Sequence, residues 1–201
     1  MPVPRPETPS QDAQQGIRRS GGRKNRGPGA AAENRSALLA AAREVFATDG
    51  YDAPLSAVAR RAGVGQGSLY RNFPDRVSLV LAAFEENVAE LEALAARPDS
   101  TLDDCLAMLT EQAITAAAFL NMLSGQDADP RVDAVAARVA AVLADKLPEA
   151  QRSGRYGTHL RPGDLLMAVG MISALIARTP PADRRSIAED AWTLLRRAFS
   201  P

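Results

Sequence analysis

Apolar residues recur at three- and four-residue spacing along most of this chain, a pattern typical of amphipathic helices that pack on one another. Ala and Leu dominate the apolar residues, and no run of β-branched residues suggests a strand, so the predicted fold class is all-α. Glycine and proline mark the ends of the predicted elements. We expect helices over residues 33–49, 54–62, 66–72, 74–97, 101–124, 130–146, 163–178 and 181–199, and a breaker-rich loop over residues 148–163.

The second and third predicted helices are short, and the turn between them contains Gly63, a residue that tolerates positive φ. Two helices joined by such a tight turn form a helix-turn-helix, whose second helix enters the major groove of DNA. Leu69 and Phe73 lie four residues apart and are expected to anchor that second helix on the others. Gly67 costs the helix roughly 1 kcal/mol relative to alanine. In exchange, it removes bulk where the helix must approach DNA closely.

The polar residues on the outer face of this helix match groups that DNA presents. Gln66 can pair bidentately with an adenine edge. Ser68, Tyr70 and Asn72 are short or rigid donors suited to phosphate oxygens. The sequence therefore predicts double-stranded DNA as a partner.

The stretch SAVARRAGVGQGSLYRNFPDRVSLV resembles the tetracycline-repressor (TetR) family of transcriptional regulators, and the likeness extends from Asn34 to Phe84. The signature of that family reads approximately T-x-x-x-I-A-x-x-A-G-V-S-x-G-T-L-Y-x-H-F-x-x-K-x-x-L. The resemblance implies a DNA-binding N-terminal domain and an all-helical C-terminal domain that dimerises and binds a ligand. The residues in register are Ala62, Gly63, Val64, Gly67, Leu69, Tyr70, Phe73 and Leu79.

Three places depart from this signature. Ala53-Pro54 stands where the family usually has Thr or Ser, so a side-chain donor and a good N-cap are lost. We therefore expect the main-chain N–H groups at this helix start to contact the DNA backbone. Asn72 replaces the usual His and Arg76 the usual Lys, and both keep a donor for phosphate. The predicted DNA-binding residues are Pro54, Gln66, Gly67, Ser68, Tyr70, Arg71, Asn72 and Arg76.

The distribution of charge agrees with a DNA-binding N-terminal part, although the formal net charge of the whole chain is zero. Residues 1–76 contain 12 Lys/Arg and 7 Asp/Glu, a net charge of +5, and residues 77–201 carry a net charge of −5. Residues 1–32 contain five Pro, five Gly and no aromatic residue, so we expect a disordered basic arm. Whether this arm adds phosphate contacts or is only a solvated tail stays open.

The expected domains after the arm are a helix-turn-helix domain over residues 33–78 and a C-terminal domain over residues 79–201. Residues 165–177 are apolar around the whole helix, which predicts burial on all sides. We expect this helix and the last one to form a four-helix interface with a second copy, the alternative being a helix buried within one chain. The predicted interface residues are Leu166, Gly170, Ala174, Trp192, Leu195 and Phe199.

The helix predicted over residues 101–124 has an ordinary core face and a second, mixed face. Flexible Met side chains with a few polar groups suit an adaptable small-molecule pocket, although Met is equally a common core filler. The sequence does not identify the effector. The predicted lining residues are Met108, Gln112, Thr115, Phe119 and Met122, with Met167 and Met171 facing them from across the bundle.

The sequence offers little for catalysis. Cys105 is the single cysteine and His159 the single histidine, which argues against a disulfide framework or a metal site. We find no nucleophile–base pair or Gly-rich phosphate loop, so we expect neither an enzyme nor a cofactor. The N-terminus lacks the apolar segment of a secretory signal, and residues 165–177 are too short to span a membrane, which together predict a cytoplasmic protein.

These observations favour a homodimeric transcriptional regulator, a repressor that a small-molecule ligand releases from a palindromic operator. The alternative from another class is a constitutive architectural protein that binds DNA without any ligand. An enzyme is the third hypothesis. Selection of bound sites from random DNA would separate the first two, because only a regulator is expected to give a short palindrome.

Overall fold

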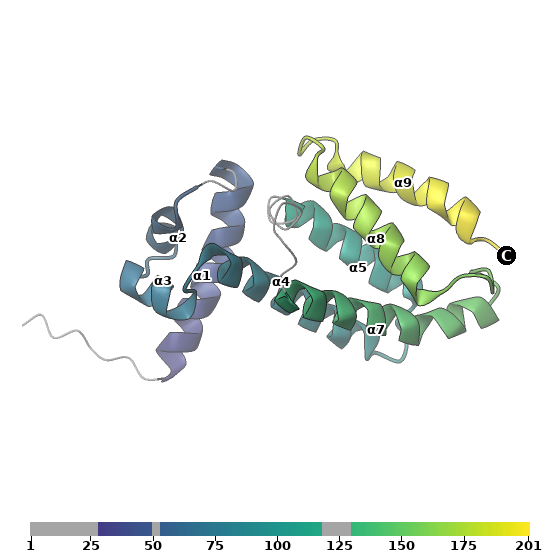
Figure 1. Cartoon of the computed structure of the whole chain (residues 1–201), viewed down its shortest axis with the longest axis horizontal. Helices are drawn as coiled ribbons and strands as arrows, with labels where there is room; N and C mark the ends of the chain where they lie inside the picture. The colour runs from purple at the N-terminus through teal and green to yellow at the C-terminus, as the bar shows by residue number, and fades with distance from the viewer. Residues whose placement is uncertain (1–27, 50–52, 118–129) are drawn as a thin grey trace, which may run out of the picture.

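The computed structural model describes residues 28–49, 53–117 and 130–201, and these ranges contain helices and no strands. Figure 1 shows an elongated molecule in which α1, α2 and α3 gather at one end, a helical bundle forms the other end, and α4 runs between them. The fold is all-α, as predicted. The helices are α1 (Pro28–Asp49), α2 (Leu55–Arg61), α3 (Gln66–Asn72), α4 (Arg76–Ala95), α5 (Leu102–Thr115), α7 (Pro130–Arg152), α8 (Pro162–Ala177) and α9 (Arg184–Phe199).

The N-terminal unit, formed by α1, α2, α3 and the first half of α4, has its own hydrophobic core. α2 and α3 each have seven residues, too few to be stable alone, so packing must hold them. Both have core residues that are fully buried, Val58 on α2 and Leu69 on α3. Phe73, directly after α3, is 1% exposed and adopts an extended backbone (φ −137°, ψ 94°) before Pro74, as predicted.

The turn between α2 and α3 is also as predicted. Gly63 has φ +65° and is one of two residues with positive φ in the described ranges. The start of α2, however, differs from the prediction. Pro54, with ψ 142°, is the N-cap of α2, and Leu55 is its first residue, so the helix begins one residue later than expected. Ala53 lies one position before the cap and is 7% exposed.

Two further boundaries are corrected by the structure. α1 begins at Pro28, five residues before the predicted start, because Ala30, Ala31 and Ala32 extend the helix with high propensity. The rest of the predicted basic arm, residues 1–27, lies outside the described residues. α7 continues through Pro148 to Arg152, inside the stretch that was expected to be a loop.

Tertiary packing explains why Pro148 does not end α7. A proline in a helix removes one main-chain hydrogen bond and crowds the preceding turn. Leu147 and Ala150, on either side of Pro148, are 3% and 1% exposed, and their burial holds the last turn in place. The helix ends at Arg152, and Gly154, two residues later, has φ +69°. The N–H groups of Arg155 and Tyr156 donate to the carbonyl of Ala150.

The C-terminal bundle comprises the second half of α4 with α5, α7, α8 and α9 and encloses a second core. α8 packs on α5, α7 and α9, and α4 packs on α7. A capping box fixes the start of α5: the Asp104 N–H donates to the Thr101 hydroxyl, and the Thr101 N–H donates to the Asp104 carboxylate. α5 ends at Thr115, and the remainder of the helix predicted to residue 124 lies mostly outside the described residues.

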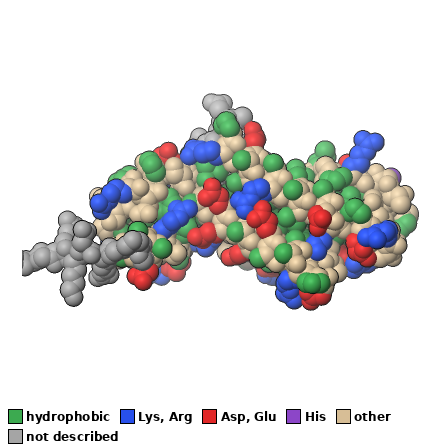
Figure 2. Space-filling view, turned by 90° about the horizontal axis from the view of Figure 1, so that it is seen from below, with side chains coloured by type: hydrophobic (Ala, Val, Ile, Leu, Met, Phe, Trp, Pro, Cys, Tyr) green, Lys and Arg blue, Asp and Glu red, His purple; other side chains and the backbone are tan. Residues whose placement is uncertain are grey.

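The two cores divide within α4. Leu79, Val80 and Ala83 belong to the N-terminal core, whereas Val88 and Leu91 belong to the bundle. The first half of α4 therefore packs with the helix-turn-helix, and the domain boundary expected at residues 78/79 stays a prediction. Figure 2 shows basic and acidic side chains interspersed along one face of both units. In the described part of the chain, no helix has the length and apolar character to cross a membrane.

Candidate nucleic-acid interface and junction cavity

One side of α3 is anchored and the other is open to solvent. Leu69 is 1% exposed, whereas Tyr70 is 52% exposed and Gln66, Gly67 and Arg71 are also exposed. A Cβ atom built on Gly67 would meet nothing within 4 Å, so no contact inside this chain requires glycine there. The open face of α3 is thus formed by the residues predicted from the sequence to face DNA.

Side chains on α3 also fold back along the helix. The Arg71 Nε donates to the carbonyl oxygen of Gly67 at 3.0 Å, and its Nη2 donates to the Ser68 hydroxyl at 3.1 Å. The Asn72 Nδ2 donates to the Ser68 carbonyl at 2.8 Å, and both Asn72 and Ser68 are half-buried. Of the predicted phosphate donors Ser68, Tyr70 and Asn72, Tyr70 is therefore the exposed one. Arg71 is also exposed, with its Nε and Nη2 atoms engaged within α3.

Arg76 has a role inside the protein that the sequence did not suggest. Its Nη2 donates to the carbonyl oxygen of Ala53 at 2.8 Å, and its guanidinium lies 5.3 Å from the ring centroid of Phe46. The side chain thus joins the start of α4 to the segment that precedes α2 and to α1. Pro54, next to this contact, is exposed. Arg76 as a phosphate donor stays a prediction, but its structural role means that its removal would alter more than DNA binding.

Sequence reasoning did not select the basic pair at the end of α2. Arg61 forms an ion pair with Glu44 of α1, whereas Arg60 is exposed on the last turn of α2, close in sequence to the turn before α3. Basic side chains beside a recognition helix commonly contact phosphates. The charge pattern ARRAG would have indicated these residues.

A cavity of about 350 Å³ lies where the N-terminal unit meets the bundle. We call it the junction cavity; α1, α4 and α5 contribute its walls. Three of the predicted ligand residues, all on α5, come together here, while Phe119 and Met122 lie outside the described residues. The lining residues are Arg43, Asn87, Glu90, Met108, Glu111, Gln112, Thr115 and Ala116.

Hydrogen bonds across the junction cavity connect the three helices. The Arg43 Nη2, on α1, lies 3.2 Å from both the Glu86 carboxylate and the Asn87 Oδ1 on α4, to which it donates. The Gln112 Nε2, on α5, donates to the Asn87 carbonyl oxygen at 2.9 Å. Asn87 therefore accepts one hydrogen bond from α1 of the N-terminal unit and another from α5 of the bundle.

Met167 and Met171 do not face this cavity, contrary to the prediction. They are 64% and 58% exposed on the outer side of α8, together with Leu175 at 44%. Within the chain, α8 is thus not buried on all sides, because α5, α7 and α9 cover only part of its circumference. Gly170 and Ala174 are also exposed on α8, and a Cβ on Gly170 would meet open space. Their place in a dimer interface stays a prediction.

The predicted interface residues on α9 lie mostly inside the chain. Trp192 and Phe199 are 8% and 6% exposed and belong to the bundle core, so they offer little surface to a partner. Leu166 and Leu195 are partly buried and pack against the same core. Leu194, which the prediction omitted, is 67% exposed. The apolar stripe of α9 covers α5 and α8 within the chain, and the four-helix interface with a second copy stays a prediction.

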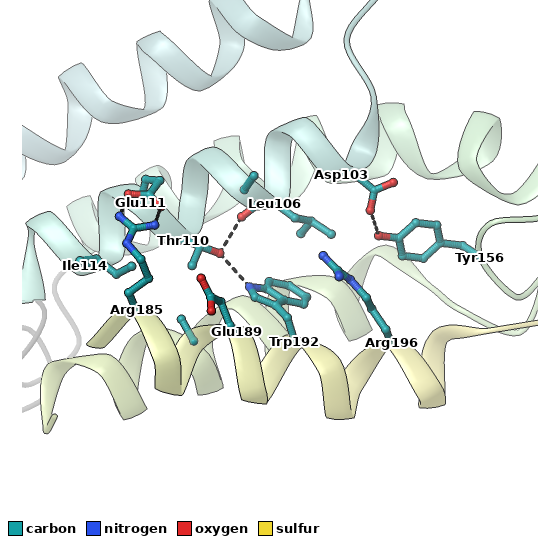
Figure 3. A pocket seen from close by; sticks show the side chains of 12 residues that line it. Asp103, Leu106, Thr110, Glu111, Ile114, Tyr156, Arg185, Glu189, Trp192 and Arg196 are labelled. Carbon is teal, nitrogen blue, oxygen red and sulfur yellow. Dashed lines mark hydrogen bonds and ion pairs between the residues drawn. The ribbon is translucent and has the colours of Figure 1, made fainter. Parts of the chain in front are cut away.

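Figure 3 shows the groove of about 160 Å³ between α5 and α9 that Trp192 enters. The Trp192 Nε1 donates to the Thr110 hydroxyl at 2.8 Å. At one end of the groove, Arg185 holds Glu111 with two hydrogen bonds, which lower the pKa of that carboxyl. This groove ties α9 to α5 and keeps Trp192 within the chain.

The other end of the groove is closed by Tyr156, which donates to the Asp103 carboxylate at 2.7 Å (Figure 3). Burial and then this hydrogen bond raise the pKa of the Tyr156 phenol well above its ordinary value of 10.0. Burial likewise raises the pKa of the Cys105 thiol, which lies in the bundle core. Both groups therefore stay neutral at physiological pH and act as structural residues.

Comparisons with known proteins agree with this geometry. Residues 38–83 match the family model described as "Bacterial regulatory proteins, tetR family". A TetR transcriptional regulator from Streptomyces coelicolor is 30% identical over 83% of this chain and 98% of its own, with a TM-score of 0.59. The chain belongs to the TetR family of transcriptional regulators. This TetR-family protein is accordingly a DNA-binding transcriptional regulator, and its α2–α3 pair is the helix-turn-helix.

Two further structures resemble this TetR-family regulator. A TetR transcription regulatory protein from Mycobacterium vanbaalenii is 26% identical, covering 86% of this chain and 98% of its own, with a TM-score of 0.56. A γ-butyrolactone receptor described as ArpA-like is 19% identical, covering 86% of this chain and 90% of its own, with a TM-score of 0.56, and shows the fold alone. A search of curated protein sequences found no match.

Proposed function

We propose that this regulator is a homodimeric repressor that binds a palindromic operator and leaves it when a small molecule binds. The observation that carries the proposal is the open face of α3, where Gln66, Gly67 and Tyr70 are exposed while Leu69 and Phe73 fix the helix from behind. A short helix held by its neighbours presents its outer side chains in one geometry, which base recognition requires.

In this proposal Gln66 reads a base and its neighbours position the helix. Gln66 is at the first residue of α3, and N-terminal residues of a recognition helix contact base edges in the major groove. Gly67, with open space around it, lets the helix approach the DNA closely. The exposed phenol of Tyr70 donates to a phosphate, which orients the helix without reading sequence.

The exposed side of α8 is the proposed dimer face. Gly170 costs a helix roughly 1 kcal/mol relative to alanine. No packing inside the chain requires it, since a side chain there would meet nothing within 4 Å. Met167, Met171 and Leu175 surround it with exposed apolar surface. A second copy packing on this side would bury that surface and would explain the small residue, because small residues allow helices to approach closely.

The ligand response is proposed to act through α4, which belongs to both cores. Its first half packs with the helix-turn-helix and its second half with the bundle, so a shift at one end must move the other. A ligand displaces operator DNA only if it fits the free conformation better than the DNA-bound one. Operator and ligand should then weaken each other's binding by the same factor. The absence of such antagonism would favour the constitutive architectural alternative.

Selection of bound sites from random DNA tests the DNA part of the proposal. We expect a pseudo-palindrome whose half-sites lie about one helical turn apart or somewhat more, because a two-fold axis relates the recognition helices. Without a consensus, the protein would be an architectural DNA binder instead.

The dimer face is tested by Gly170→Trp, which should give monomers that bind the selected DNA poorly. Ala144→Trp is the matched control, because Ala144 is an exposed alanine on α7 and not on α8. Light scattering measures the mass of each variant. A wild-type monomer at micromolar concentration, or an unchanged dimer in the Gly170 variant, would contradict the α8 interface.

A further inference from the structure

We infer that the junction cavity binds a small amphipathic amine, with its ammonium group held by Glu90 and its apolar part lying against Met108. This inference rests on the proposed ligand control and specifies the chemistry of the ligand. It follows from three features of the cavity: its size, the balance of its charges, and the polar atoms that its walls leave unused.

The size of the cavity suits a small molecule. Its volume of about 350 Å³ is at the lower end of the roughly 300–1,000 Å³ typical of ligand pockets. Met108 and Ala116 contribute apolar surface to it, and the unbranched Met side chain adapts its shape to different apolar groups. The remaining walls are polar, so a purely apolar ligand would leave their hydrogen-bonding groups without partners.

The charges around the cavity leave one carboxylate unbalanced. Arg43 is paired with Glu86, and Glu111 is paired with Arg185. Among the described residues, none forms an ion pair or a hydrogen bond with the side chain of Glu90, which is exposed at the wall. The walls therefore carry one surplus negative charge, which favours a cationic ligand over an anionic one.

The uncharged polar groups also favour a ligand that donates hydrogen bonds. Gln112 uses one of its two amide N–H groups for the Asn87 carbonyl, which leaves its side-chain oxygen as an acceptor and the other N–H as a donor. Thr115 donates its hydroxyl hydrogen to the Glu111 carbonyl, so its oxygen can still accept. A protonated amine has two or three donors and no acceptor, and it complements this set. A lactone offers only acceptors on its ring and therefore has no donor for the Gln112 and Thr115 side-chain oxygens.

Binding here would reach the DNA-reading unit directly. Asn87 accepts hydrogen bonds from Arg43 of α1 and from Gln112 of α5. An ammonium group among these residues competes with Arg43 for the Asn87 side-chain oxygen and for the nearby carboxylates. Weakening the hold of Arg43 loosens α1 from α4, which changes the position of the helix-turn-helix relative to the bundle. Ligand binding and operator release are thereby coupled through one side chain.

The experiment compares three probes with the same ring. 2-Phenylethylamine, 2-phenylethanol and phenylacetate are titrated into the full chain without DNA, at low salt, by calorimetry. We expect the amine to bind most tightly and its affinity to fall as salt is added. Glu90→Gln should weaken amine binding about fivefold, the effect of losing one partly exposed ion pair, and should leave binding of the alcohol unchanged.

Asp145→Asn is the control, because Asp145 is an exposed carboxylate on α7 that does not line the cavity. It should bind the amine as the wild type does. Equal amine affinity in the Glu90→Gln variant, tighter binding of phenylacetate, or no amine binding at millimolar concentration would overturn the inference. In contrast, an amine that binds through Glu90 but leaves operator affinity unchanged would support the site and contradict the proposed ligand control.

Discussion

The N-terminal unit and the C-terminal bundle are both helical, but they are stabilised differently. α2 and α3 have seven residues each, and neither has a side-chain N-cap hydrogen bond. The bundle helices are longer, and the start of α5 is fixed by a capping box. In the N-terminal unit, these short helices depend mainly on packing, with polar contacts such as the Arg61–Glu44 ion pair at their edges. In the bundle, capping and ion pairs such as Glu92–Arg138 add to the core.

This difference agrees with the DNA-binding role of the N-terminal unit and with the ligand and dimer roles proposed for the bundle. The outward side chains of a recognition helix are chosen for their contacts with DNA, so they cannot also be chosen for helix stability. The bundle must keep cavities and an exposed apolar side without unfolding, so its helices carry stabilising contacts elsewhere. Residues close together in the sequence form the outer face of α3, whereas segments distant in the sequence line the cavity proposed as the ligand site.

The largest expected effect comes from Phe73→Ala. Phe73 is 1% exposed in the N-terminal core, and truncating a buried Phe typically costs about 3–5 kcal/mol. Trp192 is the only tryptophan and lies in the bundle, so its fluorescence reports on that core alone, whereas circular dichroism reports on all helices. We expect denaturant to unfold the N-terminal helices of this variant first, with DNA binding lost.

Tyr70→Ala is the control. Because Tyr70 is 52% exposed, this substitution should change the free energy of unfolding little. Coincident shifts of the fluorescence and circular dichroism transitions in Phe73→Ala would show that α4 makes the two cores one cooperative unit. The two regions would then differ in how their individual helices are stabilised, but they would unfold together.

Gln66→Ala tests whether the face of α3 reads bases. We expect a loss of about 1–3 kcal/mol at one base position of each half-site, with relaxed preference there. Tyr70→Phe should instead weaken binding to all sequences by a similar amount, since a phosphate contact carries no sequence information. Site selection with each variant measures this. An unchanged preference in Gln66→Ala would remove Gln66 from base recognition.

Thr110→Val tests a contact that holds the bundle together. It removes the acceptor of the Trp192 indole N–H, which donates to Thr110 at 2.8 Å, and should lower the free energy of unfolding by about 1 kcal/mol. Thr110→Ser keeps the hydroxyl and should recover most of the stability. Urea denaturation followed by Trp192 fluorescence gives both values. If Ser and Val variants were equally unstable, packing of the Thr methyl group, not the hydrogen bond, would be responsible.

The smallest effect is expected from Glu92→Gln. The hydrogen bonds from Arg138 hold the pKa of the Glu92 carboxyl below its ordinary value of 4.5. Because the folded state lowers this pKa, the pair stabilises the protein above pH 4.5, and the stabilisation is lost as the pH falls through the lowered value. The variant should therefore lose slightly less stability on acidification than the wild type does. Denaturation curves at successive pH values below neutrality test this, and parallel curves would show that the pair contributes nothing.

Much of the N-terminal unit could be predicted because its signals are local. The positive φ of Gly63, the span of α3 from Gln66 to Asn72 and the extended Phe73 all follow from single residues and their immediate neighbours. The burial of Leu69 follows from helical periodicity. The role of Arg76 could not be predicted, since its partners Ala53 and Phe46 are distant in sequence.

The sequence by itself determined the all-α class, the helix-turn-helix and its outward residues, because backbone preferences and hydrophobic periodicity act over a few residues. Only the tertiary structure decided that Pro148 stays inside α7, that Trp192 packs against Thr110 instead of facing outward, and that Met167 is exposed. An apolar stripe shows that a surface will be covered, but not by which element. The covering element depends on the tertiary packing of the long helices. In this bundle, that packing leaves one side of α8 exposed and a cavity beside α1.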